Sequence, residues 1–274
     1  MFDNPITLIR GGDQQHGMGN EESRTIKTAE RLFDIIEGLD ELGQAGVTEL
    51  ANHVDMPKSS LYQYLSTFER RGYVIKKNGT YRLSLRLLGQ GTKIRENMAL
   101  YKHGRPYLDD LAERTGENVW LTAEEHGYCV TLDRAVGEHG FEKFSGTIGG
   151  RSKLHTHAAG KAILAHFPEE RVNDIVDRHG LTAQTDATIR ERETLFEELS
   201  TIRDRGYALN DNESIEGVRA VGVVIMAKQE VLGSIAVGGP QNRLQGDYYR
   251  DELPTLLQGV ANEIELQTSV TSPW

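Results

Sequence analysis

The chain has 274 residues, of which 38% are hydrophobic and 26% charged, a composition typical of globular proteins and a length sufficient for two domains. No apolar run approaches the roughly 18 residues of a membrane span, and the N-terminal sequence lacks the basic and apolar segments of a secretory signal. We therefore expect a cytoplasmic protein without a membrane partner. The single cysteine, Cys129, excludes an intramolecular disulfide and is expected to be a buried, inert thiol.

The N-terminal segment contains four glycines and few apolar anchors, so residues 1–22 are predicted to be a disordered leader. Apolar residues then recur at helical spacing from Ile26 to Leu39, and Gly43 predicts the end of this helix. This helix is expected to pack behind two shorter ones.

The segment from Val47 to Leu83 has the order helix, turn, helix and hairpin. A short helix is predicted to begin behind Thr48, whose hydroxyl can cap it. Pro57 can occupy the first position of the next helix but cannot continue the preceding one. Asn78-Gly79 between two alternating segments is a strong hairpin signal. The order predicts a winged helix-turn-helix domain over residues 23–83.

This predicted domain carries a local positive charge on an acidic chain. Between Pro57 and Arg86 there are seven basic residues and a single acidic one, Glu69, whereas the whole chain carries a net charge of −10. Phosphate neutralisation dominates affinity for duplex DNA, and a recognition helix presents its outward N-terminal residues to base edges. A solvated helix face beside a charged loop is the alternative. The predicted DNA-binding residues are Arg24, Lys58, Ser59, Ser60, Tyr62, Gln63, Lys76, Lys77, Asn78 and Arg82.

The acid excess has two explanations. Of the 31 basic residues 10 are lysine, against 41 acidic residues, and this resembles the lysine-poor, acidic surfaces of proteins from extreme halophiles. In molar salt, counterion release weakens, so base contacts and shape readout would carry more of the specificity. The alternative is a mildly acidic protein at ordinary salt that is steered by the basic window alone.

The remaining sequence predicts a linker and a second domain. Residues 84–102 are helix-prone and contain Gly89 and Gly91, which fits a linker helix able to bend. From His103 onward helices and strands alternate, so residues 103–274 are predicted to form an α+β domain around one antiparallel sheet. Helices are predicted at 106–114, 155–167, 169–179, 189–205 and 248–266, and strands at 118–123, 128–134, 221–227 and 231–238.

Short motifs along the chain resemble the IclR family of transcriptional regulators. They are Arg24-Thr25-Ile26, Met56-Pro57-Lys58-Ser59-Ser60, the run from His155 to Ala162, Gly206-Tyr207-Ala208-Leu209, Gly217-Val218-Arg219, and Gly239-Pro240 with Arg243-Leu244. The resemblance covers about residues 23–268. It implies a winged helix-turn-helix, a linker helix and a GAF-like effector-binding and oligomerisation domain. It also implies a dimer or a dimer of dimers that binds double-stranded operator DNA and responds to a small metabolite, often a carboxylate.

The resemblance also implies where the effector binds. The candidate residues are Gly160, Lys161, Ala162, Asn210, Asp211, Arg219, Ala220, Ala236 and Gly238. Family members commonly have Asp, Cys, Ser and Ser where this chain has Asn210, Ala220, Ala236 and Gly238. The predicted pocket is thus less polar and larger, which favours a sugar acid, an aromatic acid or no ligand over glyoxylate or pyruvate.

Two of the candidate effector residues have two interpretations each. Gly160 in the first turn of a helix lets a ligand approach free N–H groups, or it allows close packing of the helix on the sheet. Arg219 is either a carboxylate partner or a brace for the Asp211-Asn212-Glu213 loop. Gln63 stands where an arginine is common, and glutamine reads adenine where arginine prefers guanine.

Two rival functions follow from other residues. The potential metal ligands are His126, Cys129, His139, His155, His157 and His166, but His155 and His157 are two residues apart and cannot share a helix face. No nucleophile elbow is present, so we expect neither a metal, nor a cofactor, nor enzymatic activity. A metal-binding sensor, or an interaction module that dimerises through its winged helix, is the alternative to a DNA-binding regulator.

Overall fold

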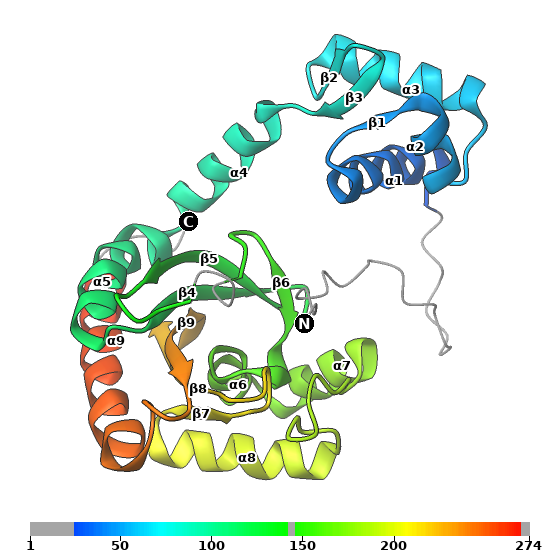
Figure 1. The fold of residues 1–274 in the computed structure, drawn as a ribbon. Coiled ribbons are helices and arrows are strands. Elements are labelled where there is room, and N and C mark those ends of the chain that lie inside the picture. The colour runs from blue at the N-terminus through cyan, green and yellow to red at the C-terminus, as the bar shows by residue number, and fades with distance from the viewer. Residues whose placement is uncertain (1–24, 142–145, 270–274) are drawn as a thin grey trace. The chain divides into compact units, whose positions relative to one another are not determined.

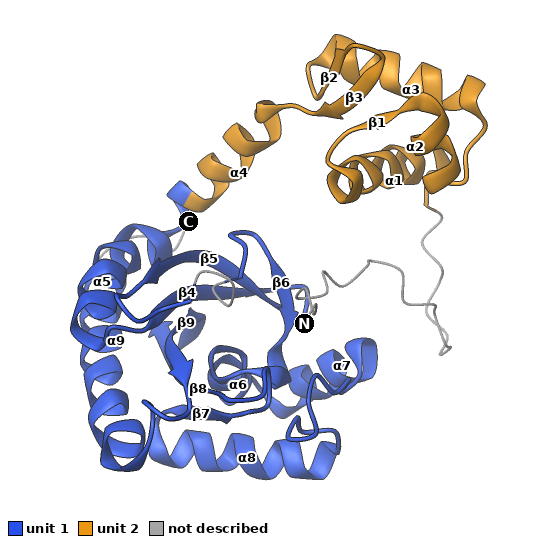
Figure 2. Cartoon of the chain, viewed as in Figure 1, with its two compact units in different colours: residues 1–12, 96–274 blue, residues 13–95 orange. Residues whose placement is uncertain are grey.

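The computed structural model describes residues 25–141 and 146–269, so Arg24 and the predicted leader lie outside the described residues. The described chain divides into two compact units, one ending at Arg95 and the other beginning at Glu96 (Figure 2). None of the described helices is both long and apolar enough to cross a membrane.

Three helices and a small sheet form the N-terminal unit (Figure 1). They are α1 (Lys27–Leu42), β1 (Ala45–Gly46), α2 (Val47–His53), α3 (Lys58–Arg71), β2 (Val74–Lys77) and β3 (Thr80–Leu83). The strands are antiparallel in the order β1-β3-β2. The largest buried side chains of this core are Ile35, Leu39, Leu50, Leu61, Leu65, Phe68 and Tyr81. A helix-turn-helix with a two-stranded wing is therefore present.

The two turns of this unit follow from residues that adopt positive φ. Asp55, between α2 and α3, has φ 46°, and α3 then begins directly behind Pro57. Asn78 and Gly79 have φ values of 50° and 82°, which is the backbone of a type I′ hairpin turn and confirms the predicted wing. The predicted Thr48 cap is wrong: α2 begins at Val47 behind Gly46 without a side-chain cap, because pairing of Gly46 with Thr80 already fixes the chain there.

The linker differs from its prediction. Helix α4 (Leu85–Asn97) runs without a break through Gly89 and Gly91, ends before Met98, and is followed by α5 (Ala99–Thr115). Pro106, expected to start a helix, lies inside α5. Neither glycine of α4 has a neighbouring atom within 4 Å of where a Cβ would lie. The break between the two helices therefore falls at Met98, which has an extended backbone, and not at either glycine.

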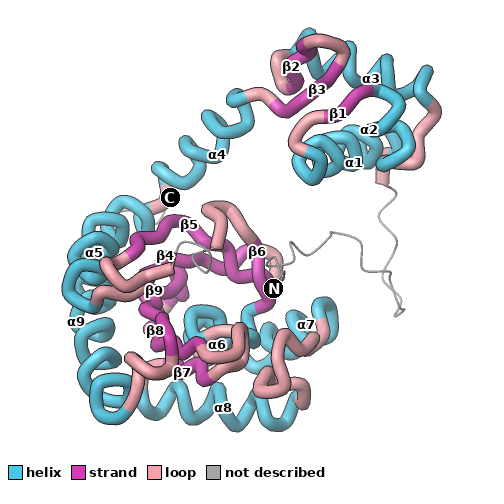
Figure 3. Tube along the Cα trace, in the orientation of Figure 1, coloured by secondary structure: helices cyan, strands magenta, loops and turns pink. Residues whose placement is uncertain are grey.

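A six-stranded antiparallel sheet organises the second unit (Figures 1 and 3). Its strands are β4 (Asn118–Glu125), β5 (Tyr128–Val136), β6 (Arg151–Lys153), β7 (Ala208–Asp211), β8 (Val218–Ala227) and β9 (Glu230–Pro240). Their order is β6-β5-β4-β9-β8-β7. The α+β architecture is thus confirmed, with β6 and β7 as additional edge strands that the sequence reading missed.

Helices cover both faces of this sheet. Helix α5 and helix α9 (Leu253–Ser269) pack on one face against inward residues such as Leu121, Ile225 and Ile235. The opposite face carries α6 (Ala158–Leu164), α7 (Glu169–His179) and α8 (Arg192–Arg205). A short 3-10 turn (Leu154–Thr156) precedes α6, and a π-helical turn (Tyr248–Glu252) precedes α9. The long strands of the sheet are buried on both faces, which explains why their sequences are mostly apolar.

Two helix-interior glycines are expected to respond in opposite ways to alanine. Gly89→Ala should raise the free energy of unfolding of the N-terminal unit by about 0.5–1 kcal/mol, because it adds helix propensity in open space. Gly104→Ala in α5 should lower that of the second unit by about 1–3 kcal/mol, because its Cβ would lie 2.9 Å from both Cδ atoms of the buried Leu121. Urea unfolding measures both. Destabilisation by Gly89→Ala would show that α4 does bend at this position.

Candidate functional site

The N-terminal end of α3 presents a polar surface. Leu61, Leu65 and Phe68 face the core, which directs the intervening residues outward. Leu65 is buried, whereas the neighbouring Tyr64 is only half-buried. Lys58, Ser59, Tyr62 and Gln63 are exposed and Ser60 is half-buried, so the five predicted α3 residues lie on one accessible helix end.

A cation–π contact connects this helix to the wing. The Lys76 Nζ lies 5.9 Å from the ring centre of Tyr62 on α3 and 5.3 Å from that of Tyr81 on β3. Interaction with the Tyr81 hydroxyl raises the pKa of Lys76. The Tyr62 ring is 52% exposed and so remains accessible beside the lysine. Lys76 therefore holds wing and recognition helix together as well as contributing charge.

The other predicted wing residues lie on the same hairpin. Lys77, Asn78 and Arg82 are exposed, and the Lys77 carbonyl accepts a 2.8 Å hydrogen bond from the Thr80 hydroxyl across the turn. The Arg82 guanidinium donates to the Leu83 carbonyl at 3.2 Å. The wing thus carries its cations on a short, internally braced hairpin.

Sequence reasoning missed a set of contacts that joins α4 to the DNA-binding unit. The Arg86 guanidinium donates to the Arg71 carbonyl at 3.0 Å and lies 4.9 Å from the Tyr73 ring centre. The Gln90 amide donates to the Tyr73 hydroxyl at 3.0 Å and lowers its pKa, and the Ser84 hydroxyl donates to the Gly72 carbonyl at 2.6 Å. These side chains showed no motif in the sequence. They hold the first turns of α4 on the end of α3 and on the residues that lead into β2.

In the second unit, the start of α6 is closed by the chain itself. Nδ1 of His157, rather than the hydroxyl of the neighbouring Thr156, accepts a hydrogen bond from the Gly160 N–H at 3.1 Å and caps the helix. The Thr156 hydroxyl instead donates to the Lys153 carbonyl. A Cβ on Gly160 would lie 2.1 Å from the Leu154 carbonyl oxygen. Close packing is therefore the reason for glycine at this position.

Lys161 and Ala162 are buried in α6, and Lys161 is a buried cation rather than an open one. Its side chain is 1% exposed, and its Nζ lies 2.7 Å from Oε1 of Glu213 and 3.5 Å from Oε1 of Glu198. Glu198 also accepts from the Arg205 guanidinium at 2.9 Å. Such a buried ammonium requires a paired carboxylate.

Arg219 serves as the brace that was one of its two interpretations. Its guanidinium makes two 2.9 Å hydrogen bonds to the two carboxylate oxygens of Asp211 and a third, of 3.1 Å, to the Leu244 carbonyl. The pair lowers the pKa of Asp211. Nearby, the Asn210 amide donates to the Thr156 carbonyl, and the Tyr249 hydroxyl donates to the Asn210 carbonyl. These predicted effector residues are thus linked to one another and to the start of α6.

The small residues expected to enlarge the pocket are instead packed by an indole ring. Ala220 pairs with Gly238 across β8 and β9, and Ala236 pairs with Trp120 on β4. A Cβ on Gly238 would lie 2.9 Å from the Ala220 Cβ and 3.2 Å from a Trp120 ring carbon. Trp120 therefore fills the space that these small side chains leave.

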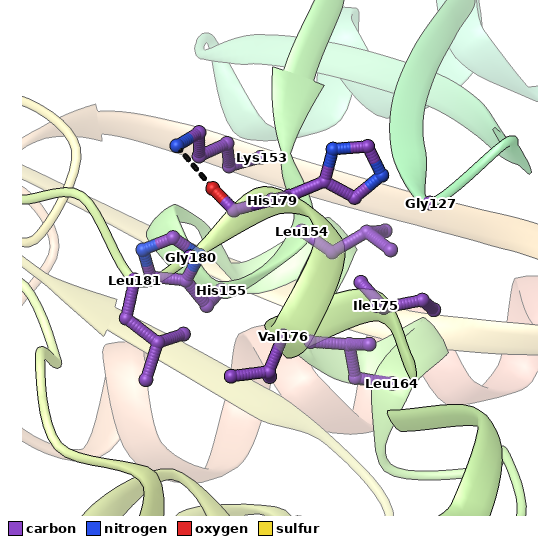
Figure 4. A pocket seen from close by; sticks show the side chains of 10 residues that line it. All are labelled: Gly127, Lys153, Leu154, His155, Leu164, Ile175, Val176, His179, Gly180 and Leu181. Carbon is purple, nitrogen blue, oxygen red and sulfur yellow. Dashed lines mark hydrogen bonds between the residues drawn. The ribbon is translucent and has the colours of Figure 1, made fainter. Parts of the chain in front are cut away.

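Two cavities in the described chain lie beside α7, away from the predicted effector residues. The smaller, of about 10 Å³, has an apolar wall from Leu154, Leu164, Ile175 and Val176 (Figure 4). At its rim the Lys153 ammonium donates to the His179 carbonyl at 2.6 Å (Figure 4). A cavity of this size holds about one water molecule. The larger, of about 400 Å³, is an open groove between the β4–β5 turn and α7, with charged walls.

The geometry around His157 argues against nucleophilic catalysis. Because its Nδ1 accepts from Gly160, its Nε2 carries the proton and donates to the Ser152 hydroxyl at 2.6 Å, so this histidine cannot act as a base toward Ser152. Burial raises the pKa of the Cys129 thiol to about 12, which keeps it protonated. Within residues 25–141 and 146–269, no group of three His, Cys, Asp or Glu side chains is arranged to hold a metal ion.

Comparisons with known proteins agree over nearly the whole chain. The family model described as the IclR helix-turn-helix domain matches residues 28–77, and the model described as the bacterial transcriptional regulator IclR C-terminal matches residues 92–266. The probable HTH-type transcriptional regulator ArcR of Halobacterium salinarum is 32% identical over 252 residues, which cover 90% of this chain and 96% of that protein.

Two solved structures have the same fold. The Thermotoga maritima IclR crystal structure matches with a TM-score of 0.74 at 27% identity. The match covers 89% of this chain and 99% of that chain. An IclR homolog from Microbacterium hydrocarbonoxydans, complexed with 4-hydroxybenzoate, has a TM-score of 0.73 and covers 88% of this chain and 100% of its own. At 19% identity this second likeness concerns the fold alone.

The histidines beside α6 predict how stability depends on pH. Burial lowers the pKa of His155 and of His157 from 6.5 to about 4. Both rings thus stay neutral in the folded chain, whereas the unfolded chain takes up protons below pH 6.5. The stabilisation is complete above this pH and is lost as the pH falls toward 4, by at most about 1.4 kcal/mol per pH unit for each histidine.

Denaturant unfolding between pH 7 and pH 4 measures this loss. His157→Asn keeps an acceptor for the Gly160 N–H but cannot titrate, so it should fold and show a shallower pH dependence than the wild type. Equal slopes for the two proteins would contradict the burial of a neutral His157.

Proposed function

The chain belongs to the IclR family of transcriptional regulators, and from this premise we propose that it reads an operator with α3 and the wing, as a dimer tuned by a small acid. Membership makes it a regulator with a helix-turn-helix DNA-binding unit and a C-terminal ligand-binding domain, in a family that is not enzymatic. The predictions of a regulator and of a protein without enzymatic activity are confirmed.

The exposed end of α3 carries the proposal of sequence-specific binding. Ser59, Tyr62 and Gln63 point outward from the first turns of the helix, where base edges are read in this motif. Lys76 and Lys77 lie on the wing beside them and suit phosphate contact. The polar α3 residues thus supply specificity, and the wing cations supply affinity.

A second copy of the chain would cover apolar side chains that the N-terminal unit exposes. Phe33 on α1 is 63% exposed, and Leu88 and Ile94 on α4 are each 64% exposed. The exposed face of α1 is rich in acids, whereas α4 has Arg86, Lys93 and Arg95 against one glutamate. Contact of α1 with the α4 of a second copy would therefore join apolar and opposite charged groups. The two-fold symmetry predicts half-sites about 34 Å apart, or a multiple of that distance.

An acidic effector and a salt-rich cell are the remaining parts of the proposal. The Microbacterium homolog was solved with an aromatic hydroxy acid, and the second unit of this chain buries the Lys161 cation that an acid would require. A sugar acid or an aromatic acid is the proposed ligand class. Similarity to a Halobacterium protein and the lysine-poor, acidic composition support DNA binding in molar salt.

Selection of binding sites from a random duplex library, in dilute buffer and in molar KCl, tests the proposal. A two-fold symmetric motif is expected. Absence of any enriched motif at both salt concentrations would favour the alternative, in which the winged helix serves dimerisation or protein interaction.

Variants on α3 and the wing should separate specificity from affinity. Ser60→Ala combined with Gln63→Ala should weaken operator binding by about 1–3 kcal/mol while leaving random DNA nearly unchanged. Lys77→Ala should weaken both alike and reduce the salt slope of log K by about 1. Titrations of fluorescent duplexes at several KCl concentrations give both quantities. Equal losses on operator and random DNA for both variants would refute this division.

Introduction of a charge on the exposed apolar face should uncouple the half-sites. Leu88→Asp should reduce the preference for a duplex with two half-sites over a duplex with one, because it disrupts contact between the two DNA-binding units. Leu266→Asp is the matched control, since Leu266 is 72% exposed on α9 in the other unit. A retained preference in Leu88→Asp would exclude α4 from the dimer contact.

A further inference from the structure

The loop that joins β7 to β8 supplies the main counter-ion of Lys161. Glu213 lies in this loop (residues 212–217), and its Oε1 is 2.7 Å from the Lys161 Nζ. The second carboxylate, that of Glu198, is farther away at 3.5 Å and is shared with Arg205. A fully buried ammonium on a helix is therefore neutralised chiefly by one side chain from a loop.

The Glu213 carboxylate is poorly satisfied where it lies. Its Oε2 is buried and accepts no hydrogen bond from any described residue. Burial raises the pKa of this carboxyl despite the adjacent lysine. The site thus favours an anion at the Lys161 end and gives the Glu213 carboxylate incomplete compensation for its own desolvation.

Hydroxyl groups attach the start of the loop to its surroundings, and backbone hydrogen bonds close its two ends, from the Asn212 N–H to the Val218 carbonyl at 2.9 Å and from the Gln241 N–H to the Gly217 carbonyl at 2.8 Å. The Thr185 hydroxyl donates to the Asn212 carbonyl at 2.7 Å, and the Thr188 hydroxyl donates to the Glu213 carbonyl at 2.6 Å. Both threonines lie between α7 and α8. Water can replace such bonds at little cost. Asp211, immediately before the loop, is by contrast fixed by the bidentate Arg219, so that opening would be confined to residues 212–217.

Other anion-binding groups near α6 are already engaged within fixed structure. The Gly160 N–H is bound by His157 in the same turn, and Arg219 is bound by Asp211 on the neighbouring strand. Lys161 differs because its closest partner belongs to a segment without regular structure.

We propose that Glu213 is an internal carboxylate ligand of Lys161, and that an acidic effector acts by putting its own carboxylate in that place and releasing the 212–217 loop. The inference rests on the proposed function, in which this unit takes a small acid. The ligand class is a small monocarboxylic acid, and the regulated element is the β7–β8 loop.

Chemical rescue tests this exchange without knowledge of the natural effector. Glu213→Ala in the full chain removes the internal carboxylate, leaves room beside Lys161 and should lower Tm. Acetate or propionate should then bind and raise Tm by about 5–10 °C when the concentration of the acid is one hundred times its Kd. KCl at equal ionic strength is the reference. Because Glu213 competes for Lys161, the wild type should bind the same acid at least about tenfold more weakly.

Two further variants identify the bound group. Glu198→Ala removes the other acid of the cluster but keeps Glu213 on Lys161, so acetate should not rescue it. Glu213→Ala combined with Lys161→Met removes the buried charge pair and should fold without responding to acetate. If Glu213→Ala does not fold without acid, Glu213→Ser, which also leaves room beside Lys161, is titrated in the same way.

A folded Glu213→Ala or Glu213→Ser that does not bind either acid would overturn the proposal, as would equal affinities of the wild type and the variant for the acid. Operator selection with the wild type is scored separately. A wild type that selects an operator, together with variants that ignore acids, rejects the exchange and leaves the regulator in place. Rescue without any selected operator would reject the proposed DNA-binding role instead.

Discussion

The close approach of α6 to the sheet is the constraint on which the second unit depends. A Cβ on Gly222 of β8 would lie 2.6 Å from the Ala158 carbonyl carbon, and one on Gly160 would lie 2.1 Å from the Leu154 oxygen. Glycine at both positions lets backbone meet backbone. The helix is thereby pressed onto the strand, and its outer side is covered by α8. Lys161 is buried as a result and must find its counter-ion inside the protein.

Elements whose ends are marked by residues such as proline, glycine or asparagine could be predicted from the sequence. Helix α7 has the bounds Glu169–His179 that were predicted, because Pro168 and Gly180 mark its two ends. The hairpin at Asn78-Gly79 followed in the same way from residues that tolerate positive φ. Strands β6 and β7 were not predicted, because three or four residues are too few to show an alternation of apolar and polar side chains. The start of α6 escaped because a histidine ring, which is not a usual capping group, closes it.

The two candidate sites differ in how far the sequence could define them. On α3 the helical period fixes which residues face outward, so the exposed polar set could be named without a structure. In the second unit the decisive facts are pairings between distant residues. Lys161 meets Glu213 across 52 positions, and Trp120 lies against Gly238 from another strand. No local pattern encodes such contacts, and the resemblance could indicate the region but not which groups neutralise one another.

The few lysines of this acidic chain are distributed unevenly between the interior of the second unit and the surface of the N-terminal unit. Lys153 and Lys161 are buried, so two of the chain's few lysines are unavailable to the surface. The N-terminal unit concentrates several of the others on α3 and the wing, beside acidic helix α1. A surface dominated by acids repels DNA, which favours the proposed contact at the face where these lysines gather.

The attachment of α4 to the end of α3 and to the residues before β2 lets that helix act as a lever arm for the N-terminal unit. Its 13 residues extend over about 20 Å at 1.5 Å per residue, and Arg86, Gln90 and Ser84 hold its first half to the DNA-binding unit. A rotation of about 10° at the Met98 end of such an arm displaces its far end by about 3.5 Å, which is one base-pair step of DNA. An angular change at this single extended residue would therefore move the end of the arm by a distance comparable to one base-pair step.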